Sequence, residues 1–150
     1  LLGKEGYRVL LGHIVTMAEV LRAKLEKAIY ACVVNDTNHG MVTLFRVYPE
    51  GVDANVAYHE ETTRPEKAGQ LLVHNAYNRR VFEALRRQVE HGEGMNLGMT
   101  DQYRLTSFGT PIAALKSFVM SPFVDEAAMD FLVRCVERAR AEVGDSLKGS

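Results

Sequence analysis

The stretch from residue 110 to residue 123, TPIAALKSFVMSPF, constrains the fold more than any other part of the sequence. It predicts a strand that ends at Ser121-Pro122 and leads directly into a helix. Its two sets of alternate residues are both largely apolar, which predicts a strand covered on both faces of a sheet. Lys116 is the single cation within it, and burying an ammonium group without a partner costs several kcal/mol. Lys116 therefore either reaches solvent or meets an anion that the neighbouring sequence does not supply.

The two ends of the chain each predict a helix with a continuous apolar face. From about residue 6 to residue 28, apolar side chains recur in steps of four and three residues: Tyr7, Leu11, Ile14, Ala18, Leu21, Leu25 and Ala28. Near the C-terminus the same spacing recurs in Ala128, Phe131, Leu132, Cys135, Val136, Ala139 and Val143. Pro122 suits the first turn of this second helix, because proline is tolerated there.

Between these helices the sequence predicts two pairs of strands and a further helix. The predicted elements are strands at residues 30–34, 41–48, 99–108 and 112–120, and a helix at residues 71–90. The turn cluster NDTNHG joins the first two strands and predicts a hairpin. Residues 51–70 mix acids and bases around a proline, which predicts a surface loop with one short helical turn near residues 54–59.

Arg46 is a second cation within an apolar strand, MVTLFRVY. The favoured interpretation is that its stem packs on the sheet while its guanidinium group lies in water. Contact with a substrate is the alternative. His59 stands beside two glutamates, but no second ligand follows at helical spacing, so no metal site is predicted.

The order of elements, α-β-β-α-β-β-α, predicts an α+β domain. We expect an antiparallel sheet of three to four strands with helices packed on one face. Because both sets of alternate residues in the 112–120 strand are apolar, we expect another domain or a second subunit to cover the opposite face.

Composition excludes several classes of function. The chain has 150 residues, which is enough for one domain, and its formal net charge is −1. Nucleic-acid binding needs a basic excess on one face, so nucleic acid is not an expected partner. No segment has the length of a membrane span, and no signal-peptide pattern is present, so we expect no membrane partner. The cysteines Cys32 and Cys135 lie in core-like segments, which favours a reducing compartment such as the cytoplasm.

No complete catalytic motif is present. The sequence contains no nucleophile elbow, phosphate-binding loop, zinc-ligand spacing or cysteine-nucleophile pattern. Several segments nevertheless resemble one family. The N-terminal helix LLGKEGYRVLLGHIVTMAEVLRAKLEK, the hairpin YACVV with GMVTLFRVY, and PIAALKSFVMSPFVDEAAMDFLVRCVERA are similar to the C-terminal small domain of group II pyridoxal-phosphate-dependent amino-acid decarboxylases, which are fold-type-I enzymes. The resemblance covers nearly the whole chain except residues 51–70, which it marks as an insertion, and makes residues 1–28 the linking helix.

The resemblance implies a function that this chain does not complete alone. The family holds pyridoxal 5'-phosphate through a Schiff-base lysine in a His-x-Lys motif of its large domain, and no His-x-Lys occurs in these 150 residues. It therefore implies no catalytic or cofactor-binding residue here, but a large domain of the same protein, an amino-acid substrate and a homodimer. Lys116 occupies the position where the family presents a basic residue, usually arginine, to the substrate carboxylate. Since lysine lacks the planar fork of arginine, this departure leaves the carboxylate contact open.

Two alternatives remain open at this stage. One is a stand-alone α+β module that dimerises through its bare sheet face and binds a small ligand there. The other is the small domain of a different fold-type-I enzyme, such as an aminotransferase. The chain opens on Leu1-Leu2 without a methionine, as a fragment of a longer protein would.

Overall fold

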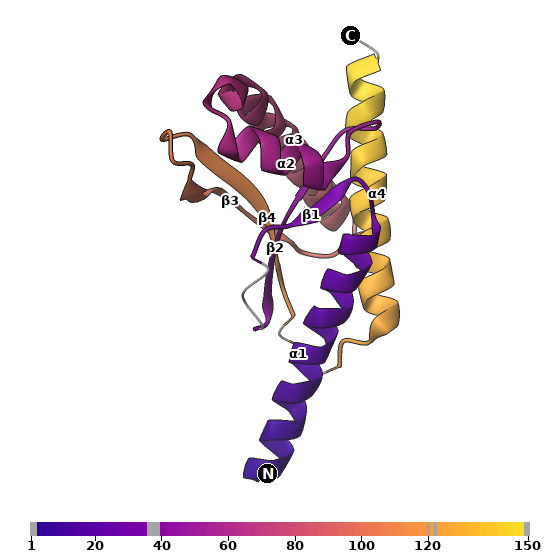
Figure 1. Cartoon of the computed structure of the whole chain (residues 1–150). Coiled ribbons are helices and arrows are strands. Elements are labelled where there is room, and N and C mark those ends of the chain that lie inside the picture. Colours follow the sequence, from indigo (N-terminus) through magenta and orange to yellow (C-terminus); the bar gives the residue numbers. More distant parts are fainter. Residues whose placement is uncertain (1–2, 36–39, 120, 122, 149–150) are drawn as a thin grey trace.

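The computed structural model describes residues 3–35, 40–119, 121 and 123–148 (Figure 1). Along the described chain the elements are α1 (Lys4–Lys27), β1 (Ala31–Val33), β2 (Val42–Val47), α2 (Ala54–Thr63), the short 3-10 helix η1 (Pro65–Lys67), α3 (Ala68–Glu90), β3 (Gly98–Leu105), β4 (Pro111–Phe118) and α4 (Glu126–Lys148). None of the helices in these ranges is long and apolar enough to cross a membrane. Met120 and Pro122, which belong to the predicted end of the last strand and the start of the last helix, lie outside the described residues.

The strands form one antiparallel sheet in the order β1-β2-β4-β3. Each hairpin pairs its own two strands, and the pairing of β2 with β4 joins the hairpins at the centre of the sheet. Lys116 on β4 lies opposite Leu44 on β2 and opposite Gly98 on β3. The prediction of an α+β domain with an antiparallel sheet of three to four strands is confirmed, with four strands.

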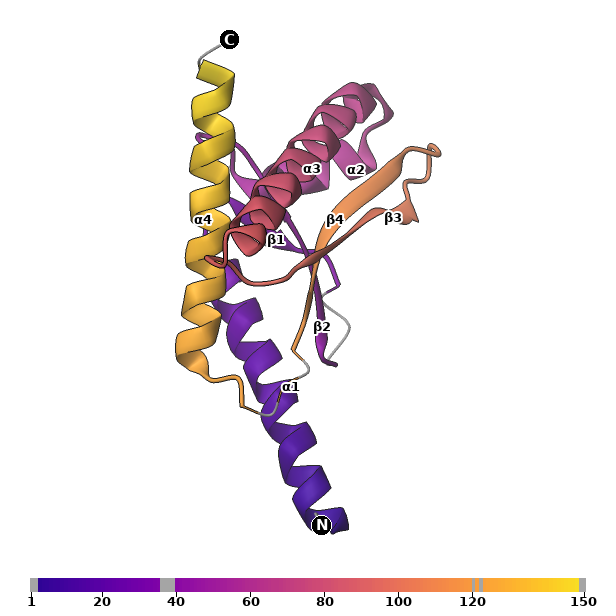
Figure 2. The ribbon, with the colours of Figure 1, turned by 180° about the vertical axis from the view of Figure 1, so that it is seen from behind.

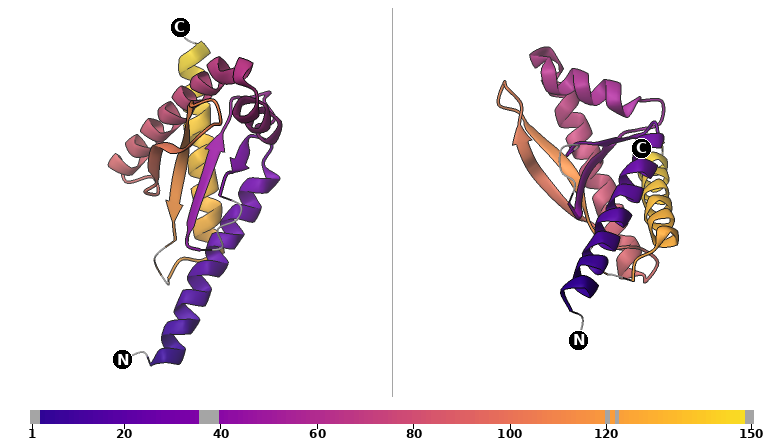
Figure 3. Two further views of the ribbon diagram at one scale, coloured as in Figure 1. Left: turned by 60° about the vertical axis from the view of Figure 1, so that its left-hand side comes forward. Right: turned by 60° about the horizontal axis from the view of Figure 1, so that its bottom comes forward.

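The long helices α1, α3 and α4 cover one face of this sheet (Figures 1 and 2). The left view of Figure 3 shows β2 and β4 in front with α4 behind them. Phe45, Val47 and Leu115 point from the strands into the core between the sheet and these helices. The predicted apolar face of the last helix is confirmed where it contributes buried side chains to that core: Leu132, Cys135, Val136, Ala139 and Val143. Because each fully buried side chain of leucine size contributes about 1.5–3 kcal/mol, this interface is the main source of stability.

Helix α1 is only partly inside the core, although its apolar spacing is continuous. Ile14, Leu21 and Leu25 are buried, whereas Tyr7 is 58% exposed and Val9 is 70% exposed. The N-terminal half of the helix extends away from the body of the domain (Figures 1 and 2). Its apolar side chains therefore meet solvent in this chain, and only the C-terminal half of the predicted stripe is packed.

The helical turn predicted near residues 54–59 lies within α2, but the surface-loop prediction for the rest of residues 51–70 is wrong, because α2 continues to Thr63 and is followed by η1 and the start of α3. Asp53 caps α2 by accepting hydrogen bonds from the backbone N–H groups of Asn55 and Val56. Pro65 then starts η1, which leads into α3. The apolar side of α2 consists of small residues, Ala54 and Ala57, so it lacks the large apolar stripe by which helices are usually predicted. Whether the segment is an insertion relative to the family stays a prediction.

Helix α2 does not join the main core. Ala54 and Ala57 pack against Cys32 and Tyr48 in a second, smaller cluster. Cys32 follows Ala31, which faces the main core, so alternation along the strand places Cys32 on the opposite face. On the sheet face away from α4, α2 thus covers the part near β1, whereas the part around Lys116 is more open. Both cysteines are buried, as predicted.

Candidate functional site

Lys116 lies on β4, on the sheet face opposite α4. It is half-buried, and its Nζ stands 4.9 Å from the centre of the Phe118 ring, which is itself 50% exposed. Gly98, on the neighbouring strand, leaves room beside it, since a Cβ atom at residue 98 would lie 3.7 Å from the Cβ of Lys116. On the other side its neighbour is Leu44, which is partly exposed. The lysine therefore stands on an apolar, accessible patch formed by three strands.

The ammonium group of Lys116 has no acidic partner in the described part of the chain. No carboxylate there approaches its Nζ within the 4.0 Å that defines an ion pair. The ammonium group instead makes a cation–π contact with the Phe118 ring. A cation over an aromatic face gains about 0.5–1 kcal/mol at an exposed site, which is less than an ion pair with a desolvated anion provides. Lys116 consequently retains the capacity to bind an anion from outside these residues.

Arg46, the second candidate residue, is fully buried, and the expectation that its guanidinium group lies in water is wrong. Nε donates to the Tyr48 hydroxyl at 2.9 Å, and Nη1 donates to Asn75 Oδ1 at 2.7 Å and to the carbonyl of Ala113 at 2.5 Å. Nη2 forms an ion pair with Glu61 at 3.0 Å. Because these partners occupy the guanidinium group inside the domain, Lys116 alone remains a candidate for contact with a substrate.

Glu61 is the centre of the network around Arg46. Its Oε1 accepts hydrogen bonds from Arg46 and from the Tyr48 hydroxyl, at 3.0 and 2.6 Å, and its Oε2 lies 2.6 Å from His74 Nδ1. Burial raises the pKa of the Tyr48 phenol far above its ordinary value, with the neighbouring Glu61 charge acting in the same direction against Arg46. Tyr48 therefore stays protonated and donates to the carboxylate.

Sequence reasoning missed Glu61 because the residue falls in the predicted loop. One signal could have found it. Ala54, Ala57 and Glu61 are spaced i, i+3 and i+7 after an Asp53 that suits an N-cap, so they share one face of a helix. That face is buried, which brings the acid to the buried arginine.

Two asparagines of α3 complete the backbone hydrogen bonding where β2 and β4 separate. The pairing of these strands ends at Phe45 opposite Leu115. Beyond it, the Asn78 side chain accepts from the N–H of Val47 and donates to its carbonyl, both at 2.9 Å. Asn75 likewise accepts from the N–H of Ala113 and donates to the carbonyl of Pro111.

Because β2 and β4 separate, Arg46 and Lys116 have different surroundings although they belong to the same sheet. Arg46 follows Leu44 by two positions and therefore shares the sheet face of Lys116. Its side chain lies at the closed end, under Glu61 of α2 and beside Asn75 of α3. The structure thus places Arg46 and Lys116 on one face but gives them different surroundings, one sealed and one open.

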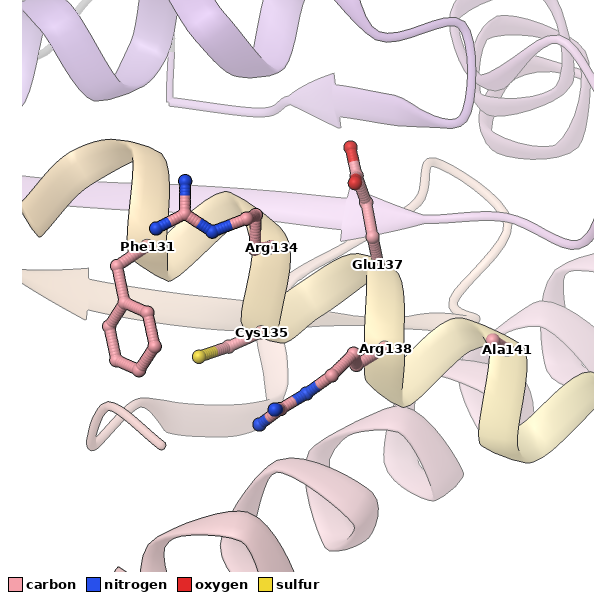
Figure 4. Close-up of a pocket in the computed structure, with 6 residues that line it drawn as sticks. All are labelled: Phe131, Arg134, Cys135, Glu137, Arg138 and Ala141. Atoms are coloured by element: carbon pink, nitrogen blue, oxygen red, sulfur yellow. The ribbon is translucent and has the colours of Figure 1, made fainter. Parts of the chain in front are cut away.

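Two surface pockets lie elsewhere, and each contains an arginine whose guanidinium group already has a partner. One pocket of about 410 Å³ lies along α4, where Arg138 points to one side with Cys135 and Phe131 (Figure 4). Arg138 donates to Gln88 Oε1 and to the carbonyl of Glu93. A second pocket, of about 750 Å³, is lined in part by Arg140, whose guanidinium group donates two hydrogen bonds to the carbonyl of Tyr48. Neither pocket includes Lys116, so the candidate site is an open sheet face.

Nothing in the described residues suggests a metal centre, since they contain no group of three or more histidine, cysteine, aspartate or glutamate side chains that could hold a metal ion.

Comparison with known proteins supports the expected fold. No family model matches the sequence, and no curated protein matches it. Among solved structures, the chain is similar to mouse CSAD, with a TM-score of 0.67 and 18% identity over 91% of this chain and 25% of that protein. It is also similar to Catharanthus roseus tryptophan decarboxylase in complex with L-tryptophan, with a TM-score of 0.59 and 11% identity over 94% of this chain and 24% of that one.

A third similar structure is the glutamate decarboxylase domain of diaminobutyrate-pyruvate transaminase and L-2,4-diaminobutyrate decarboxylase from Vibrio parahaemolyticus. Its TM-score is 0.55, with 13% identity over 89% of this chain and 22% of that chain. The chain therefore has a fold that occurs within group II pyridoxal-phosphate-dependent decarboxylases, as the sequence resemblance predicted. It spans about a quarter of the length of these proteins.

Proposed function

We propose that this chain is the C-terminal small domain of a pyridoxal-phosphate-dependent amino-acid decarboxylase, in which Lys116 orients the substrate carboxylate and the domain closes over the active site. The observation that carries this proposal is the half-buried Lys116 on an open sheet face, whose ammonium group has no acidic partner among the described residues. An amino-acid carboxylate provides the anion that this position lacks.

The surroundings of Lys116 favour a useful contact. The Phe118 ring and the partly exposed Leu44 are apolar neighbours that exclude water once a second surface covers them. A hydrogen bond between an ammonium group and a carboxylate contributes about 1.5–3 kcal/mol. Lysine holds a carboxylate as a point charge, so it fixes the position of the substrate more than its rotation. Closure of the domain would supply the remaining orientation.

The chain's own residues do not fit pyridoxal phosphate, so we assign the cofactor to a large domain of the same protein. The sequence has no His-x-Lys motif, and Arg138 and Arg140, which line the two pockets described above, already donate to protein groups. We derive no chemical step at the cofactor from this chain. In the proposed protein, bound pyridoxal phosphate would supply the electron sink for loss of carbon dioxide. We further propose that the full-length protein is a cytoplasmic homodimer.

The first experiment is to read the natural coding sequence upstream of Leu1 and to express the full-length protein. We expect an in-frame large domain with a His-x-Lys motif, and release of an amine and carbon dioxide from at least one amino acid in a panel of the common ones. A keto-acid product would instead indicate an aminotransferase. If a start codon stood just before residue 1, the decarboxylase proposal would fail, leaving the stand-alone module.

The role of Lys116 is tested in the same full-length enzyme. Since the lost contact is charge-assisted, we expect Lys116→Ala to lower kcat/KM by about 10- to 100-fold. Lys116→Arg should retain more activity than Lys116→Ala. Lys27→Ala is the matched control, because Lys27 is an exposed lysine at the end of α1. Unchanged kinetics in Lys116→Ala would show that Lys116 does not touch substrate, without affecting the assignment of the domain.

A further inference from the structure

A second cationic cluster lies where β3 meets α2. Arg104 on β3 donates from Nε to the hydroxyl of Tyr103 and from Nη2 to the hydroxyl of Tyr58 on α2, both at 3.1 Å. The two tyrosine hydroxyls also contact each other. Arg104 is exposed, while both tyrosines are partly buried. One guanidinium group and two phenols from two different elements therefore converge at one accessible point.

This cluster has more hydrogen-bond donors than acceptors. Each phenol oxygen accepts one hydrogen bond from Arg104, and the contact between the hydroxyls uses only one of their two hydrogens. Burial raises the pKa of the Tyr103 phenol, so its hydroxyl keeps its hydrogen. The second phenol hydrogen and further N–H groups of Arg104 then have no acceptor among the described residues. The cluster can therefore still donate to an incoming group.

The positive charge of Arg104 is also unbalanced. The acid nearest to it in the strand, Asp101, forms an ion pair with Arg79 of α3. No carboxylate in the described residues forms an ion pair with Arg104. Surplus donors and surplus positive charge at one point favour an oxyanion as ligand.

The strand register separates this cluster from Lys116. Arg104 lies opposite Ile112, and Gly98 lies opposite Lys116, so the side chains of Arg104 and Lys116 leave the same face of the sheet. Ile112 and Lys116 are four residues apart on β4, which corresponds to about 13 Å along a strand. The two side chains therefore leave the sheet about 13 Å apart.

We propose that Tyr58, Tyr103 and Arg104 form a second anion-binding site, which accepts a small oxyanion, either a phosphate or a carboxylate group. The site does not depend on the proposed decarboxylase function. It assigns a role to part of the 51–70 segment, because α2 supplies Tyr58.

The test is equilibrium dialysis of the full-length protein against radiolabelled inorganic phosphate and, separately, against radiolabelled acetate, at constant ionic strength set with chloride. We expect Arg104→Gln to lose one equivalent of bound phosphate, acetate or both per chain. The anion that is lost identifies the source of the oxyanion. At least one of Tyr103→Phe and Tyr58→Phe should weaken that binding by about tenfold or more, because one of the two phenols donates its free hydrogen to the charged group.

Arg86→Gln is the matched control, since Arg86 is an exposed arginine on α3 whose guanidinium group lies 5.9 Å from the centre of the Phe82 ring. It should bind as the wild-type protein does. Circular dichroism establishes that each variant is folded, and the conservative tyrosine variants test the site independently of Arg104. Wild-type stoichiometry in Arg104→Gln, or an equal loss in Arg86→Gln, would overturn the proposal. Loss of carbon dioxide release plays no part in this readout, so the two proposals fail separately.

Discussion

The buried pair of Arg46 and Glu61 makes a specific prediction about stability. Both side chains are 0% exposed, and among the residues that the structure describes Glu61 is the only acid paired with Arg46. Glu61→Gln keeps the volume and the carbonyl oxygen that can accept from Arg46 and Tyr48, but it removes the negative charge. It therefore isolates the electrostatic part of the interaction from packing.

The expected loss in the free energy of unfolding follows from the burial of the Arg46–Glu61 pair. Removing one partner of a buried ion pair costs about 3–5 kcal/mol, because the other charge is left uncompensated. A domain of this size has a total stability of about 5–15 kcal/mol, so Glu61→Gln removes a large share of it. The hydrogen bonds from Arg46 to Asn75 and Ala113 offset part of the loss, and we therefore expect about 3 kcal/mol, at the lower end of the range.

The assay is urea denaturation of the 150-residue chain, followed by far-ultraviolet circular dichroism. Glu66→Gln is the control, since Glu66 is exposed and lies in the adjoining η1; it should change the free energy of unfolding by less than about 0.5 kcal/mol. The double variant Arg46→Met with Glu61→Leu should cost less than the sum of its single changes. A cost below about 1 kcal/mol for Glu61→Gln would refute the claim that the charge pair matters.

Three further predictions test other parts of the fold. Gly94→Ala should destabilise the domain by about 1–3 kcal/mol, because the new Cβ would lie 2.7 Å from the Cβ of Gln88. Gly12→Ala should instead stabilise α1 by up to about 1 kcal/mol, because a Cβ at residue 12 would have nothing within 4 Å. Thermal unfolding of the two variants compares these effects. Asn78→Ala should cost about 2–4 kcal/mol in urea denaturation, because it leaves the N–H and C=O of Val47 without their partner; a loss below 1 kcal/mol would contradict this. Above pH 10 the free energy of unfolding should fall by about 1.4 kcal/mol per pH unit from Tyr48. Its native pKa is raised by burial, so the native state binds more protons than the unfolded state; Tyr48→Phe should show a smaller alkaline slope, and an unchanged slope would exclude Tyr48 as the cause.

The sequence predicted those parts of the fold in which apolar periodicity and packing coincide. The last helix is an example, because the residues at its apolar positions from Leu132 to Val143 are buried in the core. The N-terminal helix shows the limit of the same reasoning. Periodicity identifies an apolar face but does not say what covers it, so Tyr7 and Leu11 share the stripe of Ile14 and yet are exposed.

The buried polar network could not be predicted because its members are distant in the sequence and individually resemble surface residues. Arg46 meets Glu61 only because α2 turns a face of small residues towards the sheet. Asn75 and Asn78 belong to a helix whose polar residues look solvated, yet their amides replace a missing strand. Lys116 was found from sequence because a lone cation in an apolar strand is visible locally, whereas a pairing between elements is not.

The half-exposed helix α1 has a mechanical consequence. It contains 24 residues and is therefore about 36 Å long, and its buried part begins at Ile14. Gly12 lies just before that boundary, and the Thr16 hydroxyl donates to its carbonyl at 2.8 Å, a bond that weakens the helical ladder at the same turn. A bend of about 10° there displaces the outer end of the helix by about 2 Å. Helix α1 is thus most easily bent where its exposed N-terminal part meets the packed core. Tilting of the domain relative to that part of the helix would therefore bend α1 at Gly12 and leave the sheet face that carries Lys116 undistorted.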